Sequence, residues 1–213
     1  MKPGQIKAII YDCDGVLIDS RESNKAYYNH ILKHFGQPPL TEEHRHTIQF
    51  LSAGEVMALI FAGTGLLDDA LAYEKTLDND RFIPLIHVEP HTREALTHVR
   101  QKYLTAIATN RGKSLRPLLD YHGLTAMFDM TVSSYDVSQT KPHPECLNII
   151  LTHFRLMPEE AFYIGDNEID HVLCERAGVL FVAYKNTSLR AVHHISDHLE
   201  LIKILALPSM PWL

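Results

Sequence analysis

The sequence has few cysteines, no excess of positive charge and no long apolar run. Cys13, Cys146 and Cys174 show no paired spacing, which is typical of reduced thiols, and we therefore expect a cytoplasmic protein. No segment approaches the roughly 20 apolar residues of a membrane-spanning helix, and the N-terminal residues contain no apolar signal core. The net charge of −6 gives no basic footprint for nucleic acid. We expect neither a membrane nor a nucleic-acid partner.

The length and composition are typical of a globular protein with more than one structural unit. The 213 residues are 46% hydrophobic and 22% charged. A chain of this length can form one large core and a smaller second unit.

The pattern of apolar residues changes near residue 90. Between residues 16 and 86 the chain is predicted to be helical with no strand, and helices are expected at residues 22–35, from Thr41, at 52–62 and at 66–81. After residue 90, strands expected at 103–108, 128–132, 161–164 and 179–183 alternate with helices expected at 92–101, 114–121, 144–154, 168–176 and 196–205. Such alternation indicates a parallel sheet with right-handed crossovers. We therefore expect an α/β core of residues 1–15 and 87–213, with residues 16–86 inserted as a helical unit.

Two carboxylates follow the first predicted strand. Residues 8–11 form an apolar run with no polar break, and Asp12 and Asp14 come directly after it. In open α/β sheets, ligands bind outside the carboxyl ends of the strands. Two nearby carboxylates repel each other unless a proton or a cation joins them, and this spacing suits a hard metal such as Mg²⁺. A polar turn at Asp14-Gly15 is an equal alternative at this point.

Further polar residues follow the later strands or precede the later helices. Thr109 and Asn110 come after the second predicted strand, where a hydroxyl, an amide and backbone N–H groups suit phosphate oxygens. Lys141 is restricted by the proline that follows it, and Asp166 and Asp170 flank the start of a helix. Each has an ordinary alternative. The Thr109-Asn110 pair can form a turn or a helix cap, and Lys141 can be a solvated surface charge. Asp166 can be a helix N-cap, and Asp170 can be an acid in the first turn of the helix. All of them at one edge of one sheet favour a functional site.

Together these motifs resemble those of the haloacid dehalogenase-like hydrolase superfamily, in its phosphoglycolate phosphatase and β-phosphoglucomutase branch. The resemblance covers essentially the whole chain and is carried by Asp12-x-Asp14-Gly15-Val-Leu-x-Asp19-Ser20, Thr109-Asn110, Lys141-Pro142 and Gly165-Asp166-x-x-x-Asp170. It implies a Rossmann-like parallel sheet with an inserted all-helical cap that closes over the site and reads the leaving group. It also implies a Mg²⁺-dependent phosphatase acting on a small-molecule phosphate ester, and we expect a monomer or a small homo-oligomer.

The resemblance assigns a catalytic or binding role to each motif residue. Asp12 is expected to be the nucleophile, and Asp14 is expected to be the general acid and base. Thr109 and Asn110 are expected to hold the transferring phosphoryl group. Lys141 is expected to balance its charge.

The resemblance also implies a set of Mg²⁺ ligands. They are Asp12, Asp166 and the backbone carbonyl of Asp14, with Asp170 either as a further ligand or as support behind them. The dianionic phosphate repels an anionic nucleophile, so Mg²⁺ and Lys141 together must offset that charge.

Other functions within and outside the superfamily are weighed against the phosphatase. Dehalogenases lack the second aspartate, and Asp14 is present. A β-phosphoglucomutase fits every core motif, but Asn24 stands where those enzymes carry a histidine, so water is the expected phosphoryl acceptor. A non-hydrolytic aspartyl-phosphate switch is a further alternative, but such proteins lack a large cap and an acid two residues after the phosphorylated aspartate, whereas both are expected here. A non-catalytic binding protein is another alternative, but it would not need every motif residue, and all of them are present. Arg111, beside the Thr109-Asn110 pair, either touches substrate or is solvated.

Overall fold

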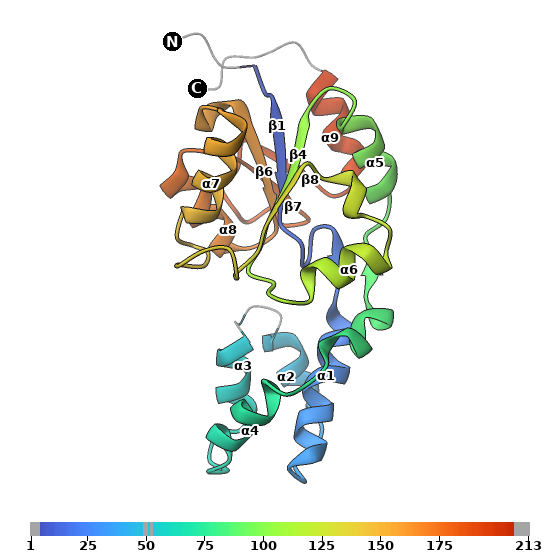
Figure 1. Cartoon of the computed structure of the whole chain (residues 1–213), viewed down its shortest axis with the longest axis vertical. Helices are drawn as coiled ribbons and strands as arrows, with labels where there is room; N and C mark the ends of the chain where they lie inside the picture. The colour runs from blue at the N-terminus through green and yellow to red at the C-terminus, as the bar shows by residue number, and fades with distance from the viewer. Residues whose placement is uncertain (1–4, 49–50, 52, 207–213) are drawn as a thin grey trace. The chain divides into compact units, whose positions relative to one another are not determined.

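The computed structural model describes residues 5–48, 51 and 53–206, and it contains two compact units (Figure 1). One unit combines Met1–Asp19 with Val88–Leu213, and the other is Ser20–His87. The division therefore falls after Asp19, whereas the sequence placed it after residue 15. Val16, Leu17 and Ile18 are fully buried, and the carbonyl oxygen of Val16 lies 2.8 Å from Nε2 of His198, which ties this short segment to the first unit.

The first unit is built on a six-stranded sheet in which every neighbouring pair is parallel. Its order is β5-β4-β1-β6-β7-β8. The strands are β1 (Ala8–Tyr11), β4 (Leu104–Ala108), β5 (Met130–Val132), β6 (Ala161–Gly165), β7 (Leu180–Tyr184) and β8 (His193–Ile195). The predicted fold class is confirmed, although β8 was not predicted from the sequence.

Strand β1 lies between β4 and β6, and its register determines what meets at the carboxyl edge. Tyr11 pairs with Ile107 on one side and with Ile164 on the other. The three strands therefore end at nearly the same level. The residues that follow them emerge side by side, which is the arrangement expected for a site at the carboxyl ends of parallel strands.

Helices cover both faces of this sheet (Figure 1). Ala8 and Ile10 of β1 belong to an apolar cluster with residues of α7 (Glu145–Phe154) and α8 (Glu168–Ala177). On the other face Tyr11 contacts His198 at the start of α9 (His198–Ala206), and α9 packs against α5 (Thr92–Val99). Since both faces are buried, the strands are continuously apolar rather than alternating. The remaining helical segments of this unit are α6 (Leu115–Tyr121), η3 (Thr125–Met127) and η4 (Pro158–Glu160).

The second unit is helical and has its own apolar core. Its segments are α1 (Arg21–His34), α2 (Glu42–Thr47), α3 (Ala53–Ile60), α4 (Leu67–Glu74) and η2 (Asn79–Leu85). The core includes Ile31 of α1, Met57 of α3 and Ala70 of α4. Thr41 caps α2 as predicted, since its hydroxyl accepts the His44 N–H at 3.1 Å.

Two details of this region differ from the sequence prediction, and a third prediction falls on a residue that the structure does not describe. The helix expected over 66–81 ends at Glu74, because Asp78 accepts the Asp80 N–H and starts a separate 3-10 turn. A short two-stranded sheet of β2 (Ile18–Asp19) and β3 (His87–Val88) was not predicted. Ser52, expected to begin a helix, lies outside the described residues.

Two expectations from composition can be compared with the described residues. Within them, no helix has both the length and the hydropathy that crossing a bilayer requires. All three cysteines are buried and none is in a disulfide.

Candidate active site

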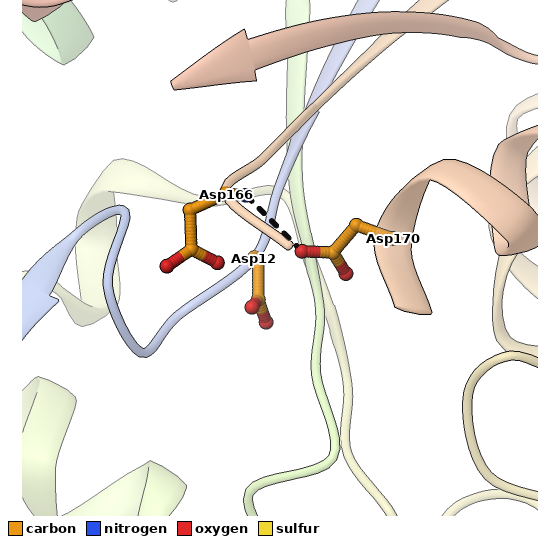
Figure 2. A group of neighbouring side chains, drawn as sticks. All are labelled: Asp12, Asp166 and Asp170. Carbon is orange, nitrogen blue, oxygen red and sulfur yellow. Dashed lines mark hydrogen bonds between the residues drawn. The ribbon is translucent and has the colours of Figure 1, made fainter. Parts of the chain in front are cut away.

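Three carboxylates meet at the carboxyl end of the central strands (Figure 2). Asp12 follows β1, Asp166 follows β6, and Asp170 lies in the first turn of α8. One oxygen from each carboxylate lies within 4.8 Å of the others. Asp12 and Asp170 are buried and Asp166 is half-buried. The structure thus groups three of the four predicted metal ligands, and the side chain of Asp14 lies outside the group.

Two glycines allow the carboxylates to approach the backbone this closely. Gly15 has a φ of +78°, and a Cβ there would lie 2.1 Å from Oδ2 of Asp166. A Cβ on Gly165 would lie 2.5 Å from Oδ2 of Asp170. Any larger residue at either position would displace a carboxylate from the group.

Asn167 caps helix α8 and holds two of these aspartates in place. Its side-chain oxygen accepts the Asp170 N–H at 3.1 Å, and its amide group donates to Oδ1 of Asp166 at 3.0 Å. The Asp166 N–H in turn donates to Oδ2 of Asp170 at 3.3 Å. The cap of this helix is therefore Asn167, and Asp166 is directed toward the other carboxylates.

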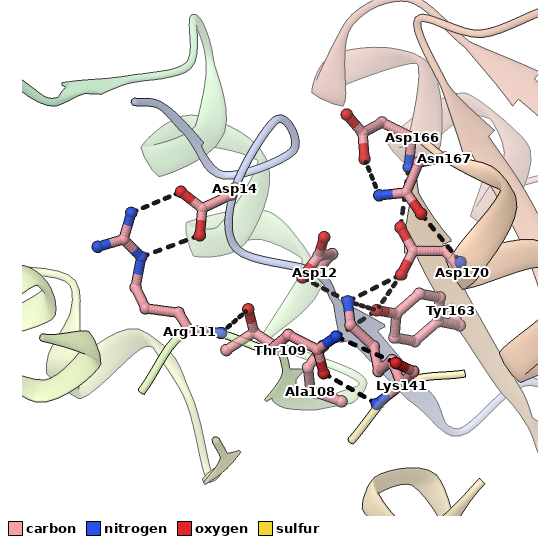
Figure 3. Close-up of polar contacts among 11 residues, drawn as sticks. Asp12, Asp14, Ala108, Thr109, Arg111, Lys141, Tyr163, Asp166, Asn167 and Asp170 are labelled. Carbon is pink, nitrogen blue, oxygen red and sulfur yellow. Dashed lines mark hydrogen bonds and ion pairs between the residues drawn. The ribbon is translucent and has the colours of Figure 1, made fainter. Parts of the chain in front are cut away.

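Lys141 supplies a positive charge to the centre of the group (Figure 3). Its Nζ lies 2.7 Å from Oδ1 of Asp12 and 2.8 Å from Oδ1 of Asp170, and it donates to the Tyr163 hydroxyl at 3.0 Å. That hydroxyl also lies 3.0 Å from Oδ1 of Asp170 and 3.0 Å from the carbonyl oxygen of Ala108. Lys141 is 7% exposed, so the solvated-charge alternative is wrong.

The Thr109-Asn110 pair lies beside Lys141. Asn110 accepts the Lys141 N–H at 2.9 Å and donates to the Lys141 carbonyl at 3.2 Å, so its side chain fixes the backbone of the lysine. Thr109 is 4% exposed, and its hydroxyl accepts the Arg111 N–H at 3.1 Å. Both residues lie at the site, and their predicted contact with a phosphoryl group stays a prediction.

Burial and mutual repulsion dominate the electrostatics of the carboxylates. Burial, together with the charges of Asp170 and Asp166, raises the pKa of Asp12 to about 7, against the opposing effect of Lys141. Burial and the charge of Asp170 raise the pKa of Asp166 to about 6. Burial alone would lower the pKa of Lys141, but Asp12 and Asp170 raise it, so the ammonium stays charged. One ammonium therefore faces three carboxylates, and negative charge is in excess.

This excess of buried negative charge fits a divalent metal ion. Oδ1 of Asp12 is buried, and despite its closeness to Lys141 no described group reaches it with hydrogen-bond geometry. Carboxylate oxygens are the ligands of hard cations. A bound cation would offset the repulsion that raises the pKa of Asp12 and Asp166. The residues present therefore fit a divalent metal site formed by Asp12, Asp166 and Asp170.

Asp14 is directed toward Arg111 rather than toward the other carboxylates (Figure 3). Its Oδ1 lies 2.5 Å from Nη2 of Arg111, and its Oδ2 accepts from Nε at 2.9 Å. Nη1 of Arg111 donates to Oγ of Ser114 at 3.0 Å. The arginine side chain is 13% exposed. The alternative that Arg111 is solvated is therefore wrong, because its largely buried guanidinium forms a bidentate ion pair with Asp14, whose side chain is 39% exposed.

Asn167 and Tyr163 were not predicted as part of the site, and for Arg111 the sequence left open whether it touches substrate or is solvated. Asn167 could have been found, since an asparagine directly before a predicted helix is a strong N-cap signal. Arg111 follows Thr109-Asn110 directly, but sequence gives no partner for it. Tyr163 lies within an apolar strand, where nothing distinguishes its hydroxyl from an ordinary core tyrosine.

Comparison with known proteins decides the family. Residues 9–184 match the family described as haloacid dehalogenase-like hydrolase. The chain belongs to this family. Among solved structures of the family, a HAD-superfamily hydrolase of subfamily IA from Geobacter sulfurreducens is 37% identical, with a TM-score of 0.85 over 95% of this chain and 98% of that one.

Several relatives of the chain are named as phosphatases. A phosphoglycolate phosphatase from Cereibacter sphaeroides is 28% identical over 204 residues, which cover 89% of this chain and 90% of that protein. The pyrophosphatase PpaX from Bacillus velezensis is 26% identical over 182 residues, which cover 84% and 82%. The resemblance seen in the motifs is thereby confirmed, and the chain is a hydrolase of the phosphatase type.

Proposed function

We propose that this protein is a Mg²⁺-dependent phosphatase that hydrolyses a small-molecule phosphate monoester through an aspartyl-phosphate on Asp12. The observation that supports this most directly is the position of Asp12. It lies at the end of the central strand, 2.7 Å from the buried ammonium of Lys141 and grouped with Asp166 and Asp170. A carboxylate in this position can attack phosphorus while the Lys141 ammonium, together with a cation that the three carboxylates would hold, offsets the charge of the phosphate.

The proposed reaction has two steps, and the same residues serve both. In the first, an oxygen of Asp12 forms a bond to phosphorus as the bond to the leaving oxygen breaks, and Asp14 donates a proton to that oxygen. In the second, Asp14 takes a proton from water, the water oxygen bonds to phosphorus, and the bond to Asp12 breaks to release inorganic phosphate. Thr109 and Lys141 are proposed to hold the phosphoryl oxygens throughout. A bound Mg²⁺ ion would neutralise part of the negative charge that accumulates there.

The substrate is proposed to be a small phosphate ester of the phosphoglycolate type. The phosphoglycolate phosphatase and the pyrophosphatase found among the relatives support a small anionic substrate. The helical unit Ser20–His87 is proposed to act as the cap that selects the leaving group.

A phosphate-release screen with Mg²⁺ tests this function. The panel contains phosphoglycolate, sugar phosphates, nucleotides and pyrophosphate, and wild-type protein is compared with Asp12→Asn. We expect wild-type protein to release phosphate from at least one small ester and the variant to release none. Equal release by both proteins, or none from any ester by the wild type, would contradict the proposal.

A further inference from the structure

The carboxylate of Asp14, which is proposed to transfer protons, is engaged in an ion pair with Arg111. Both carboxylate oxygens contact the guanidinium, Oδ1 at 2.5 Å from Nη2 and Oδ2 at 2.9 Å from Nε. To protonate a leaving oxygen, Asp14 has to turn one of these oxygens toward the phosphoryl site beside Asp12. The bidentate contact with Arg111 is therefore incompatible with that step as long as both oxygens are engaged.

Opening this pair has a cost that depends on what replaces Asp14. The Arg111 side chain is 13% exposed, so solvent alone compensates its charge poorly once the carboxylate leaves. Its third nitrogen remains bound to Oγ of Ser114 at 3.0 Å, which keeps the guanidinium in place when its partner changes. The planar guanidinium fits a carboxylate or phosphate in the same two-point geometry that it uses with Asp14.

We propose that a second anionic group on the substrate, carried by the leaving group, replaces Asp14 at Arg111 and thereby releases Asp14 for proton transfer. This inference rests on the proposed phosphatase function and specifies its substrate class. The class is phosphate esters whose leaving group bears a carboxylate or a second phosphate. Arg111 is then a specificity-determining residue. The exchange breaks no covalent bond, because one anion replaces another at the same cation. The released Asp14 carboxylate, whose side chain is 39% exposed, takes a proton from bulk solvent before it donates one to the leaving oxygen, and it returns that proton to solvent when the pair with Arg111 forms again.

The ion pair between Arg111 and Asp14 couples binding of the second anion to protonation of the leaving oxygen. A substrate without the second anion leaves Asp14 bound to Arg111, so its leaving oxygen receives a proton slowly. A substrate with that anion both binds more tightly and gains access to the acid. Discrimination should therefore appear in kcat as well as in KM, which a purely structural role of Arg111 would not produce.

The experiment compares two ligands that differ by one charge, 2-phosphoglycolate and its neutral amide, 2-phosphoglycolamide. Binding is measured by calorimetry on proteins carrying Asp12→Asn to prevent turnover, and kcat and KM are measured on proteins with Asp12 intact. The tested changes are Arg111→Gln, Arg111→Lys and Asp14→Asn. Arg116→Gln is the matched control, because Arg116 is exposed and pairs with Asp120 at 3.0 Å.

We expect protein with Arg111 intact to bind phosphoglycolate with a Kd about tenfold lower than that of the amide, as one charge-assisted contact allows. Arg111→Gln should abolish this preference and Arg111→Lys should retain part of it, while Arg116→Gln should leave it unchanged. Asp14→Asn removes the competing carboxylate, so it should tighten binding of phosphoglycolate and leave binding of the amide unchanged. This last result does not depend on whether Arg111→Gln folds.

Two results would overturn the inference. One is the same preference in Arg111→Gln as in the wild type, and the other is no tightening in Asp14→Asn. These are separable from failure of the proposed function. If wild-type protein binds the charged ligand preferentially through Arg111 but releases no phosphate, the phosphatase proposal fails and the anion exchange stands. If phosphate is released with no charge preference, only the exchange fails.

Discussion

The Nζ atom of Lys141 lies 2.7 Å from Oδ1 of Asp12, and both side chains are almost fully buried. Removing a charge pair from water is costly, so such a pair rarely persists for stability alone. Here the ammonium also contacts Asp170 and the Tyr163 hydroxyl, which fixes its position toward the nucleophile. The Lys141–Asp12 pair therefore affects both the stability of the fold and the reactivity of Asp12, and the two effects can be measured separately.

Lys141→Met is expected to reduce both stability and activity. The change leaves Asp12 and Asp170 buried without their cation, and breaking a buried pair typically costs about 3–5 kcal/mol. Phosphate release should fall by at least about 100-fold, as is typical when a group that stabilises transition-state charge is removed. Thermal denaturation and phosphate release measure the two effects. Lys203→Met, at an exposed position of α9, is the control, and similar losses in both variants would contradict the assignment.

Asp12→Asn is expected to abolish turnover without loss of the fold. Asparagine has nearly the same size but cannot attack phosphorus, and it removes one of three mutually repelling carboxylates. Mass spectrometry of quenched reactions should detect a phosphorylated peptide containing Asp12 in wild-type protein and none in the variant. A phosphopeptide that maps to another residue would show that the nucleophile is elsewhere.

Mg²⁺ is expected to stabilise the protein, and chelation is expected to remove activity. A ligand that binds only the folded state at about 100 times its Kd adds about 2.7 kcal/mol to the free energy of unfolding. The increase in Tm should disappear in Asp166→Asn and persist in Asp69→Asn, an exposed aspartate of the helical unit. EDTA should abolish phosphate release and excess Mg²⁺ should restore it. Activity that survives chelation would exclude the proposed role of the metal.

The metal-free protein is expected to lose stability as the pH rises from about 4 toward about 7. Burial first, and neighbouring carboxylates second, raise the pKa of Asp12 from 3.8 to about 7 and that of Asp166 from 3.8 to about 6. Below pH 3.8 both groups are protonated in the folded and unfolded chains, so their contribution is fully present. As the pH rises, the unfolded chain releases protons that the folded chain retains, and the free energy of unfolding falls until the folded pKa is passed.

Thermal denaturation in EDTA across this pH range measures the effect. Asp12→Asn should show a shallower fall than wild-type protein, because one of the two titrating groups is gone. Adding Mg²⁺ should raise the Tm most at the upper end of the range, where the carboxylates are ionised. Identical slopes for the two proteins would mean that Asp12 does not titrate as described.

Water is expected to be the phosphoryl acceptor rather than a sugar hydroxyl. The resemblance implies that Asn24 takes the place of a histidine found in the mutases of this branch, and asparagine cannot change its charge near neutral pH. Its side-chain amide contacts Oγ of Ser20 at 3.5 Å, within the helical unit. With β-glucose 1-phosphate and catalytic glucose 1,6-bisphosphate, any turnover should yield free phosphate. Efficient formation of glucose 6-phosphate with little free phosphate would instead identify a mutase.

The sequence predicted the sheet and the main motif residues because their signals are local. Apolar runs identify β1, β4, β6 and β7, and the polar residues that follow them lie at the strand ends where parallel topology brings them together. The short strand β8 was missed because His193-His194-Ile195 has no apolar run. Its strand conformation comes from pairing with β7, which is a tertiary effect.

The parts of the site that could not be predicted depend on pairing between distant residues. The direction of Asp14 is set by Arg111, which is far along the chain, and no local pattern specifies that choice. The amide of Asn110 bonds through both its oxygen and its nitrogen to the backbone of Lys141, a pairing that no local pattern specifies, and its predicted contact with a phosphoryl group stays a prediction. A motif can therefore identify which residues assemble while leaving open which of them contact one another.

The central position of β1 also has a consequence for how the chain acquires its structure during synthesis. Ala8 pairs with Leu104 on one edge and with Ala161 on the other. Strand β1, which leads to the proposed nucleophile, is therefore synthesised before both of its partner strands, and its pairing is complete only after β6 has been synthesised. The helical unit, whose core comes from residues close in sequence, can form earlier. A nascent chain that ends before residue 161 already contains Asp12, Asp14, Thr109 and Lys141, but it leaves an apolar edge of β1 unpaired. Such an intermediate is exposed to aggregation until β6 is added.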